Sequence, residues 1–139
     1  MGVVQRHPRR TVRRDQVPAM KISTGCDVEQ VERFSKLLEK EHFCRRIFTE
    51  TERAYISKSG HPAQTAAGIF CAKEAMSKAL GCGLFGLLPQ ELGLEWDERG
   101  APRPRLSGGA AERFGHLQLA ISVSHTKETA FATCVALEE

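Results

Sequence analysis

The sequence lacks the features that identify several common classes of protein. No run of apolar residues is long enough to cross a membrane, and the N-terminus has no apolar core of the kind that a signal peptide needs. The motifs GxxxxGKS/T, HExxH and GxSxG do not occur, which argues against a P-loop nucleotidase, a zinc protease and a serine hydrolase. We therefore expect a cytoplasmic protein of a different class.

Cysteines are few and are poorly spaced for a structural role. They are odd in number and include no close CxxC pair of the kind that a zinc site uses. This usage favours free thiols that act as small buried hydrophobic side chains in a reducing compartment over disulfides or a zinc site. The five residues are Cys26, Cys44, Cys71, Cys82 and Cys134.

The chain of 139 residues has a net charge of +3 that is unevenly distributed. Residues 1–19 hold five arginines and a single acidic residue, so this tail is strongly basic and the remainder is close to neutral. The tail has no hydrophobic periodicity and contains Pro8 and Pro18, which predicts disorder. Two interpretations fit: a passive extension or misassigned start upstream of Met20, which we favour, and a segment that contacts nucleic acid or an anionic surface. We expect one domain over residues 20–139, with no membrane or nucleic-acid partner.

The domain opens with a pattern that predicts a strand followed by a helix. Residues 20–26 alternate between apolar and polar side chains, as in a short strand. Apolar residues at helical spacing then predict a helix over residues 28–40. Asp27 lies at the junction, and two interpretations stay open: a carboxylate that caps the helix N-terminus, and a metal ligand held at the end of a strand.

Three more helices are predicted before the chain turns to strands. A short one covers residues 43–48, and Thr49–Glu52 has the S/T-x-x-E form of a capping box that starts another helix ending near Lys58. A long central helix covers residues 68–81, where good helix formers place apolar side chains on one broad face between two terminal glycines.

The second half of the chain shows mainly the two-residue period of strands. Residues 92–96 and 102–106 predict a hairpin, and Ser107 is placed to cap a short helix after it. Two final strands, over residues 117–123 and 130–137, flank a turn. Together these elements predict an α+β domain in which a mostly antiparallel sheet packs against the long central helix.

A few polar residues lie within these structured, apolar surroundings, namely Asp27, Glu74, Lys78, Ser124 and His125. Glu74 and Lys78 share a face of the central helix, either as a surface ion pair or as part of a site. Two carboxylates from separate elements suit Mg²⁺, and a helical lysine with a hydroxyl-bearing turn suits phosphate oxygens. His125 taken alone favours a structural role. The residues by themselves indicate a Mg²⁺–phosphate site and go no further.

Three blocks occur in order along the domain: Gly25–Phe34 (GCDVEQVERF), Phe70–Gly81 (FCAKEAMSKALG) and Val123–Thr126 (VSHT). In order and separation they resemble the holo-[acyl-carrier-protein] synthase family, the small 4′-phosphopantetheinyl transferases. Phe48–Glu52 also fits a short segment of that family. The resemblance extends from Met20 to the C-terminus and implies the family's fold.

The resemblance also implies a reaction. Members transfer 4′-phosphopantetheine from coenzyme A to a serine of an acyl carrier protein, release 3′,5′-ADP, use Mg²⁺ and support fatty acid biosynthesis. Asp27 and Glu74 would be the Mg²⁺ ligands, and Glu74 would take the serine proton. Members are typically homotrimers with active sites at subunit interfaces, which implies a trimer here. The implied catalytic residues are Asp27, Glu74 and Lys78; the implied coenzyme A contacts are Lys58, Lys78, Ser124, His125 and Thr126; and the implied carrier contacts are Arg33, Arg45 and Arg46.

One residue departs from the family's pattern. The family usually has an arginine directly before the phenylalanine of the central block, and Ile69 stands there in this chain. Either Lys58 or Lys73 compensates, or coenzyme A binds more weakly. The alternative to an active enzyme is therefore an impaired homologue that binds carrier protein or nucleotide without transfer.

Overall fold

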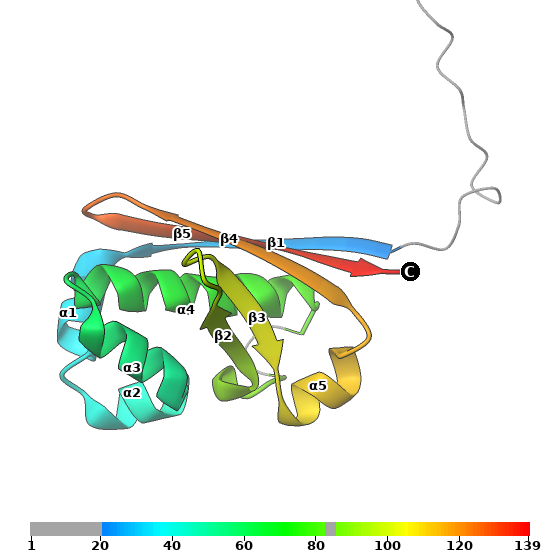
Figure 1. Ribbon diagram of the computed structural model, residues 1–139, viewed down its shortest axis with the longest axis horizontal. Helices are drawn as coiled ribbons and strands as arrows, with labels where there is room; N and C mark the ends of the chain where they lie inside the picture. Colours follow the sequence, from blue (N-terminus) through cyan, green and yellow to red (C-terminus); the bar gives the residue numbers. More distant parts are fainter. Residues whose placement is uncertain (1–20, 83–85) are drawn as a thin grey trace, which may run out of the picture.

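The computed structural model describes residues 21–82 and 86–139 (Figure 1). One layer is a three-stranded antiparallel sheet in which β5 (Thr129–Glu138) lies between β1 (Lys21–Gln30) and β4 (Gln118–His125). The second layer contains the helices and a separate two-stranded hairpin (Figure 1). This is the predicted α+β fold with antiparallel pairing.

The central helix α4 (Pro62–Ala79) lies along one face of the sheet (Figure 1). The β5 side chains on the buried face are all small, and less volume between the two backbones lets helix and sheet approach closely. Figure 1 shows none of the described elements over the opposite face of the sheet. The small residues of β5 are Ala130, Ala132, Cys134 and Ala136.

The remaining elements lie on the same side of the sheet as α4, and β3 (Pro102–Leu106) reaches β4 of the sheet (Figure 1). The predicted capping box is present, because Thr49 Oγ1 accepts a hydrogen bond from the Glu52 N–H and Glu52 Oε1 accepts one from the Thr49 N–H. The predicted hairpin is also confirmed. These elements are α1 (Val31–Leu37), α2 (Glu41–Ile47), α3 (Glu50–Lys58), the 3₁₀ turn η2 (Pro89–Glu91), β2 (Leu92–Trp96), β3 (Pro102–Leu106) and α5 (Gly108–Phe114).

The predicted strand-to-helix junction at residue 27 is wrong. β1 continues through Gln30 because it pairs with β5 over its full length, with Asp27 opposite Ala132 and Gln30 opposite Thr129. The helix that follows is therefore short and ends at Leu37. Asp27 lies inside a strand rather than at a helix N-terminus, so the capping interpretation is also wrong.

Two other predictions about helix ends are wrong. α4 begins at Pro62 rather than at Gly68, and proline is favoured in the first turn of a helix. Gly68 lies within the helix, where a Cβ would come 3.1 Å from Val123 Cγ1 of the sheet. The Ser107 side chain makes no capping hydrogen bond to α5; Glu91 Oε2 instead accepts one of 2.9 Å from the Ala110 N–H.

The cysteines are all free, as predicted. Only Cys71 and Cys134 are buried; Cys26 is exposed, and Cys44 and Cys82 are partly buried, so the prediction of general burial is wrong. None of the described helices has both the length and the apolar character needed to span a bilayer. The predicted basic tail, residues 1–19, lies outside the described residues.

Candidate active site

The candidate site lies where β1 crosses α4. Gly25 is so close to the helix that a Cβ there would come 2.1 Å from the Ala75 carbonyl oxygen and 2.9 Å from Lys78 Cβ. This crossing brings the following residues of the strand beside the helix. Lys78 Nζ is 3.5 Å from Asp27 Oδ1 and donates a hydrogen bond of 3.0 Å to the Cys26 carbonyl oxygen.

Glu74 lies one turn before Lys78 on the same side of α4. Lys78 pairs with Asp27 across the two layers, so the interpretation of Glu74 and Lys78 as a simple surface ion pair is wrong. Burial raises the pKa of Glu74, and the negative charge of Asp27 raises it further, while Lys78 lowers it. The charge of Asp27 therefore acts on Glu74, and the two carboxylates belong to one site. We call Asp27, Glu74 and Lys78 the carboxylate site.

A third carboxylate, Glu29, lies close enough to Asp27 for their charges to interact, and the sequence analysis missed it. Glu29 follows Asp27 by two residues on β1, so both side chains point to the same face of the sheet. Burial raises the pKa of Glu29, and the charge of Asp27 raises it further. Arg33 Nη1 is 3.1 Å from Glu29 Oε2, and its guanidinium carbon is 5.9 Å from the ring centroids of both Phe34 and Phe70. Had the strand been predicted to continue past Asp27, its two-residue period would have placed Glu29 on the same face as Asp27.

The donor set fits a divalent cation that prefers oxygen ligands. Asp27 Oδ2 is buried and has no hydrogen-bond partner among the described residues, a cost that a bound cation would remove. No three potential ligand side chains come together to enclose a metal in the described part of the chain. Mg²⁺ is usually held by one or two carboxylates, with phosphates and waters completing the octahedron. Asp27 and Glu74 therefore suit Mg²⁺ shared with a phosphorylated ligand better than a closed structural metal site.

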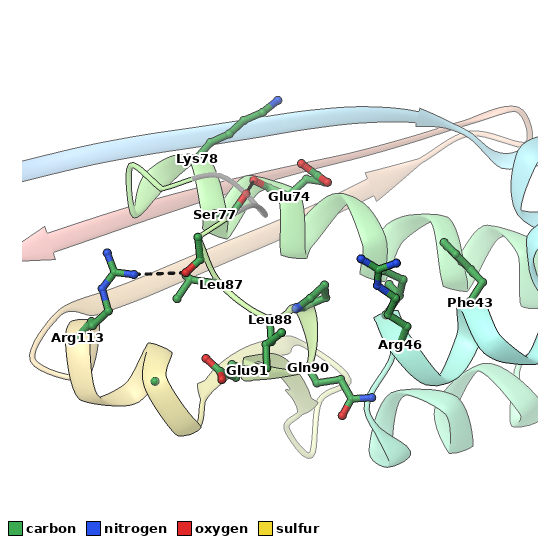
Figure 2. Close-up of a pocket in the computed structure, with 14 residues that line it drawn as sticks. Phe43, Arg46, Glu74, Ser77, Lys78, Leu87, Leu88, Gln90, Glu91 and Arg113 are labelled. Atoms are coloured by element: carbon green, nitrogen blue, oxygen red, sulfur yellow. Dashed lines mark hydrogen bonds between the residues drawn. The ribbon is translucent and has the colours of Figure 1, made fainter.

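A groove of about 1050 Å³ opens beside the carboxylate site (Figure 2). Figure 2 shows Glu74 and Lys78 of α4 along one side of it and the segment 86–91 along the other. Arg46 of α2 and Arg113 of α5 lie toward its two ends. Arg46, Lys78 and Arg113 outnumber the two carboxylates of the lining, Glu74 and Glu91, which favours a ligand that carries negative charge and that a divalent cation at Glu74 would help to bind.

The prediction that the strand ends at residue 123 is wrong, because Ser124 and His125 pair with β5 as the last residues of β4. The segment Ser124–Thr126 does not reach the carboxylate site within one chain. The carbonyl oxygen of its last residue accepts a hydrogen bond of 3.0 Å from Gln64 Nε2, near the start of α4. Gln64 and Glu74 are separated by about 15 Å along the helix axis. His125 and Glu29 flank the same residue of β5 in the sheet, one on each neighbouring strand.

One more of the predicted coenzyme A contacts, Lys58, lies apart from the carboxylate site. Lys58 lines a separate hollow of about 470 Å³ together with Tyr55 and Trp96, whose ring centroids are 3.7 Å apart. Arg45 forms an exposed pair of 2.8 Å with Glu41 on its own helix.

The expectation that Lys73 compensates for Ile69 is wrong. Lys73 Nζ is 2.7 Å from Glu52 Oε1, and the two side chains are 1% and 0% exposed. Burial lowers the pKa of Lys73, and the charge of Glu52 opposes that effect. The ammonium group of Lys73 is enclosed in the interior and is not available to a nucleotide.

Fold and site together define a class of protein. Oxygen ligands for a divalent cation and an adjacent lysine lie where an antiparallel sheet crosses one long helix, beside a groove with basic ends. Such an arrangement suits an enzyme that acts on a phosphorylated ligand.

Comparison with known proteins identifies the family. The model of the 4′-phosphopantetheinyl transferase superfamily matches residues 23–135. A holo-[acyl-carrier-protein] synthase of Caldanaerobacter subterraneus subsp. tengcongensis is 40% identical over 122 residues, covering 85% of this chain and 96% of that protein. This chain therefore belongs to the 4′-phosphopantetheinyl transferase superfamily, and the holo-[acyl-carrier-protein] synthases are its relatives.

Solved structures show the same fold. A holo-(acyl-carrier-protein) synthase from Bacillus anthracis in complex with CoA (3′,5′-ADP) has a TM-score of 0.74 and 33% identity, covering 87% of this chain and 100% of that one. The Helicobacter pylori holo-[acyl-carrier-protein] synthase in complex with coenzyme A has a TM-score of 0.72 and 28% identity, covering 81% and 98%.

Proposed function

We propose that this protein transfers the 4′-phosphopantetheine group from coenzyme A to a serine of apo acyl carrier protein, releases 3′,5′-ADP, depends on Mg²⁺ and serves fatty acid biosynthesis. The observation that carries the proposal is the convergence of Asp27, Glu74 and Lys78 beside the groove. The names of the relatives and the coenzyme A complexes of two of them support it.

Asp27 and Glu74 would hold the Mg²⁺. The buried Oδ2 of Asp27, which has no hydrogen-bond partner in the described part of the chain, and the mutual repulsion of the two carboxylates both favour a bound cation. When bound, the ion neutralises the pyrophosphate and stabilises the charge that develops during transfer.

Glu74 would accept the proton of the attacking serine hydroxyl, directly or through a water. Burial and the charge of Asp27 raise its pKa in the absence of the ion, and a bound Mg²⁺ would lower it again, so Glu74 would be ionised and able to act as the base. The serine oxygen forms a bond to the β-phosphorus of coenzyme A, the bond from that phosphorus to the bridging oxygen breaks, and 3′,5′-ADP leaves with the electron pair. Lys78 Nζ, on a side chain that is 52% exposed, would contact the phosphate oxygens.

The basic residues near the carboxylate site would meet the acidic carrier. Arg33, with a side chain that is 55% exposed, is held beside the site by Glu29, and Arg46 lies in the groove. Arg45 is the neighbouring, more exposed candidate. Positive charge at these positions would attract the acidic carrier and bring its serine toward the carboxylate site.

We further propose a homotrimer in which neighbouring copies cover the open face of the sheet. Large apolar side chains are exposed on that face, and a soluble protein rarely leaves such a set uncovered. The separation of the segment Ser124–Thr126 from Glu74 within one chain favours a site that two subunits share. Lys58, Ser124, His125 and Thr126 would then contact coenzyme A from the neighbouring copy. The exposed apolar residues are Ile22 (67%), Val28 (59%), Phe131 (38%) and Val135 (39%).

An intact-mass assay tests the function. Apo acyl carrier protein is incubated with the protein, coenzyme A and Mg²⁺, with a chelator control and a Glu74→Gln variant beside it. We expect the carrier to gain one phosphopantetheine only with Mg²⁺ and intact Glu74. No added mass with several carriers at high coenzyme A would contradict the proposal, and retained binding of carrier or nucleotide would then favour the impaired homologue.

A further inference from the structure

The buried ion pair between Glu52 and Lys73 has no role in the proposed chemistry. Its polar atoms are nevertheless fully used: Lys73 Nζ donates to Glu52 Oε1 at 2.7 Å, to the Pro89 carbonyl oxygen at 2.9 Å and to the Leu92 carbonyl oxygen at 3.0 Å. An ammonium group has three donors, so none is left over. The pair therefore joins α4 to both ends of η2.

Glu52 connects the same point to the elements on its other side. Its Oε1 also accepts from the Thr49 N–H at 2.9 Å, and its Oε2 accepts from the Leu94 N–H of β2 at 2.8 Å. A buried ion pair is a weak way to gain stability, since apolar residues of similar volume often do as well. What this pair supplies is geometry, because every bond outside it fixes a backbone atom.

The backbone that Lys73 fixes is one wall of the groove. Pro89, Gln90 and Glu91 of η2 line the groove together with Glu74 and the segment before them (Figure 2). Lys73, the residue before Glu74, thus ties this wall to α4. Its side chain points to the interior and not into the groove.

The wall in turn holds α2. Phe43, Cys44 and Ile47 of this helix pack against the core but are only partly buried, and its last turn also contacts η2. Gln90 Nε2 donates a hydrogen bond to the Arg45 carbonyl oxygen in the last turn of α2. That turn carries Arg46, which Figure 2 shows reaching toward the groove. A chain of contacts therefore leads from Lys73 through η2 to the basic end of α2.

We infer that Glu52 and Lys73 are positioning residues that hold the basic end of α2 beside Glu74 and thereby set the affinity for the acidic carrier protein. The identity of the ligand rests on the proposed function, while the positioning of α2 does not. Both side chains are fully enclosed and touch no substrate. Their loss would affect binding of the carrier through Arg45 and Arg46 and would leave the contacts of Lys78 with coenzyme A in place.

The main test is the double variant Glu52→Gln/Lys73→Met, which removes both charges at nearly constant volume. We expect KM for the carrier to rise about tenfold, as for coupled residues in contact. KM for coenzyme A and kcat at saturating carrier should change by less than about twofold, because the lost interaction is one of uniform binding. Amide hydrogen exchange in Glu41–Ile47 should become faster while exchange in the sheet stays unchanged.

Two further variants make the result independent of how well the double variant folds. Gln90→Ala deletes the bond to the Arg45 carbonyl and leaves the Glu52–Lys73 pair intact, and it should show the same KM split to a smaller extent. Ile56→Ala, a matched control, opens a cavity beneath α3 and removes none of the hydrogen-bonding groups of the network, and it should lower stability without any KM split. A merely structural pair would make the double variant behave like Ile56→Ala.

Either of two results would overturn the inference. One is unchanged hydrogen exchange of α2 in both the double variant and Gln90→Ala. The other is that the KM values for the carrier and for coenzyme A rise equally in those variants, or that both stay unchanged. If the unmodified protein transfers nothing to any carrier, the proposed function fails, and the exchange of α2 still decides whether the pair positions that helix.

Discussion

Replacing Gly25 with alanine tests whether the close crossing of β1 over α4 builds the carboxylate site. The added Cβ would lie 2.1 Å from the Ala75 carbonyl oxygen and 2.7 Å from the Ala79 nitrogen. Both are backbone atoms, so no change of side-chain rotamer relieves the clash. Because real Cβ contacts are essentially never shorter than 3.0 Å, strand and helix must separate by about 1 Å. Overpacking of this kind lowers the free energy of unfolding by about 1–3 kcal/mol.

The loss of activity should exceed this loss of stability. Asp27 follows Gly25 by two residues on β1, so the same movement carries its carboxylate away from Glu74 and Lys78. Misplacing reacting groups by about 1 Å costs about 100-fold in rate. We expect kcat/KM of Gly25→Ala to fall by about 100-fold, measured by intact mass well below the unfolding temperature, with weaker Mg²⁺ binding in calorimetry.

Gly60→Ala is the matched control, because a Cβ there would meet nothing within 4 Å. This variant should keep the unmodified rate and stability to within about 0.5 kcal/mol. A folded Gly25→Ala protein with unmodified kcat/KM and Mg²⁺ affinity would refute the reasoning. It would show that the site does not depend on the distance between strand and helix.

Three other changes are expected to have distinct effects. Lys78→Met should lower kcat/KM for coenzyme A about 100-fold in steady-state kinetics, and unchanged kinetics would contradict its role. Val28→Asp should prevent the proposed trimer from forming in sedimentation and remove activity with it, because it places a charge on the open sheet face; a trimeric variant would argue for a different interface. Without divalent cations, the raised pKa values of Glu29 and Glu74 mean that the folded state binds more protons than the unfolded state just above pH 4.5. The free energy of unfolding should therefore rise as pH falls toward 4.5, and urea titrations should show a smaller rise for Glu74→Gln.

The parts of the fold that depend on local signals could be predicted from the sequence. The capping box at Thr49 and Glu52 begins α3 as predicted, and the helix ends at Lys58 as expected. The hairpin of β2 and β3 was also predicted, since its turn and its alternation both lie within a short stretch. In these cases the interactions that decide the structure come from residues next to one another in the chain.

Features that depend on distant partners were missed. β1 extends to Gln30 because β5, a hundred residues later, offers a partner for every residue of it. This pairing overrides the helical spacing of the apolar residues and puts Glu29 on the same face as Asp27. The ion pair of Glu52 and Lys73 likewise depends on how α3 packs against α4.

The angular positions of residues around α4 explain why Ile69, in place of the family's usual arginine, does not alter the carboxylate site. Ile69 and Lys73 are four residues apart, about 40° around the helix, whereas Lys78 is about 140° from Lys73. Accordingly Ile69 is 4% exposed in the core and Lys73 is enclosed, while Lys78 is half exposed beside Asp27. An arginine in place of Ile69 would lie on the interior side of α4, away from the carboxylates. Its absence therefore changes a different side of the helix, and this favours an active transferase over an impaired homologue.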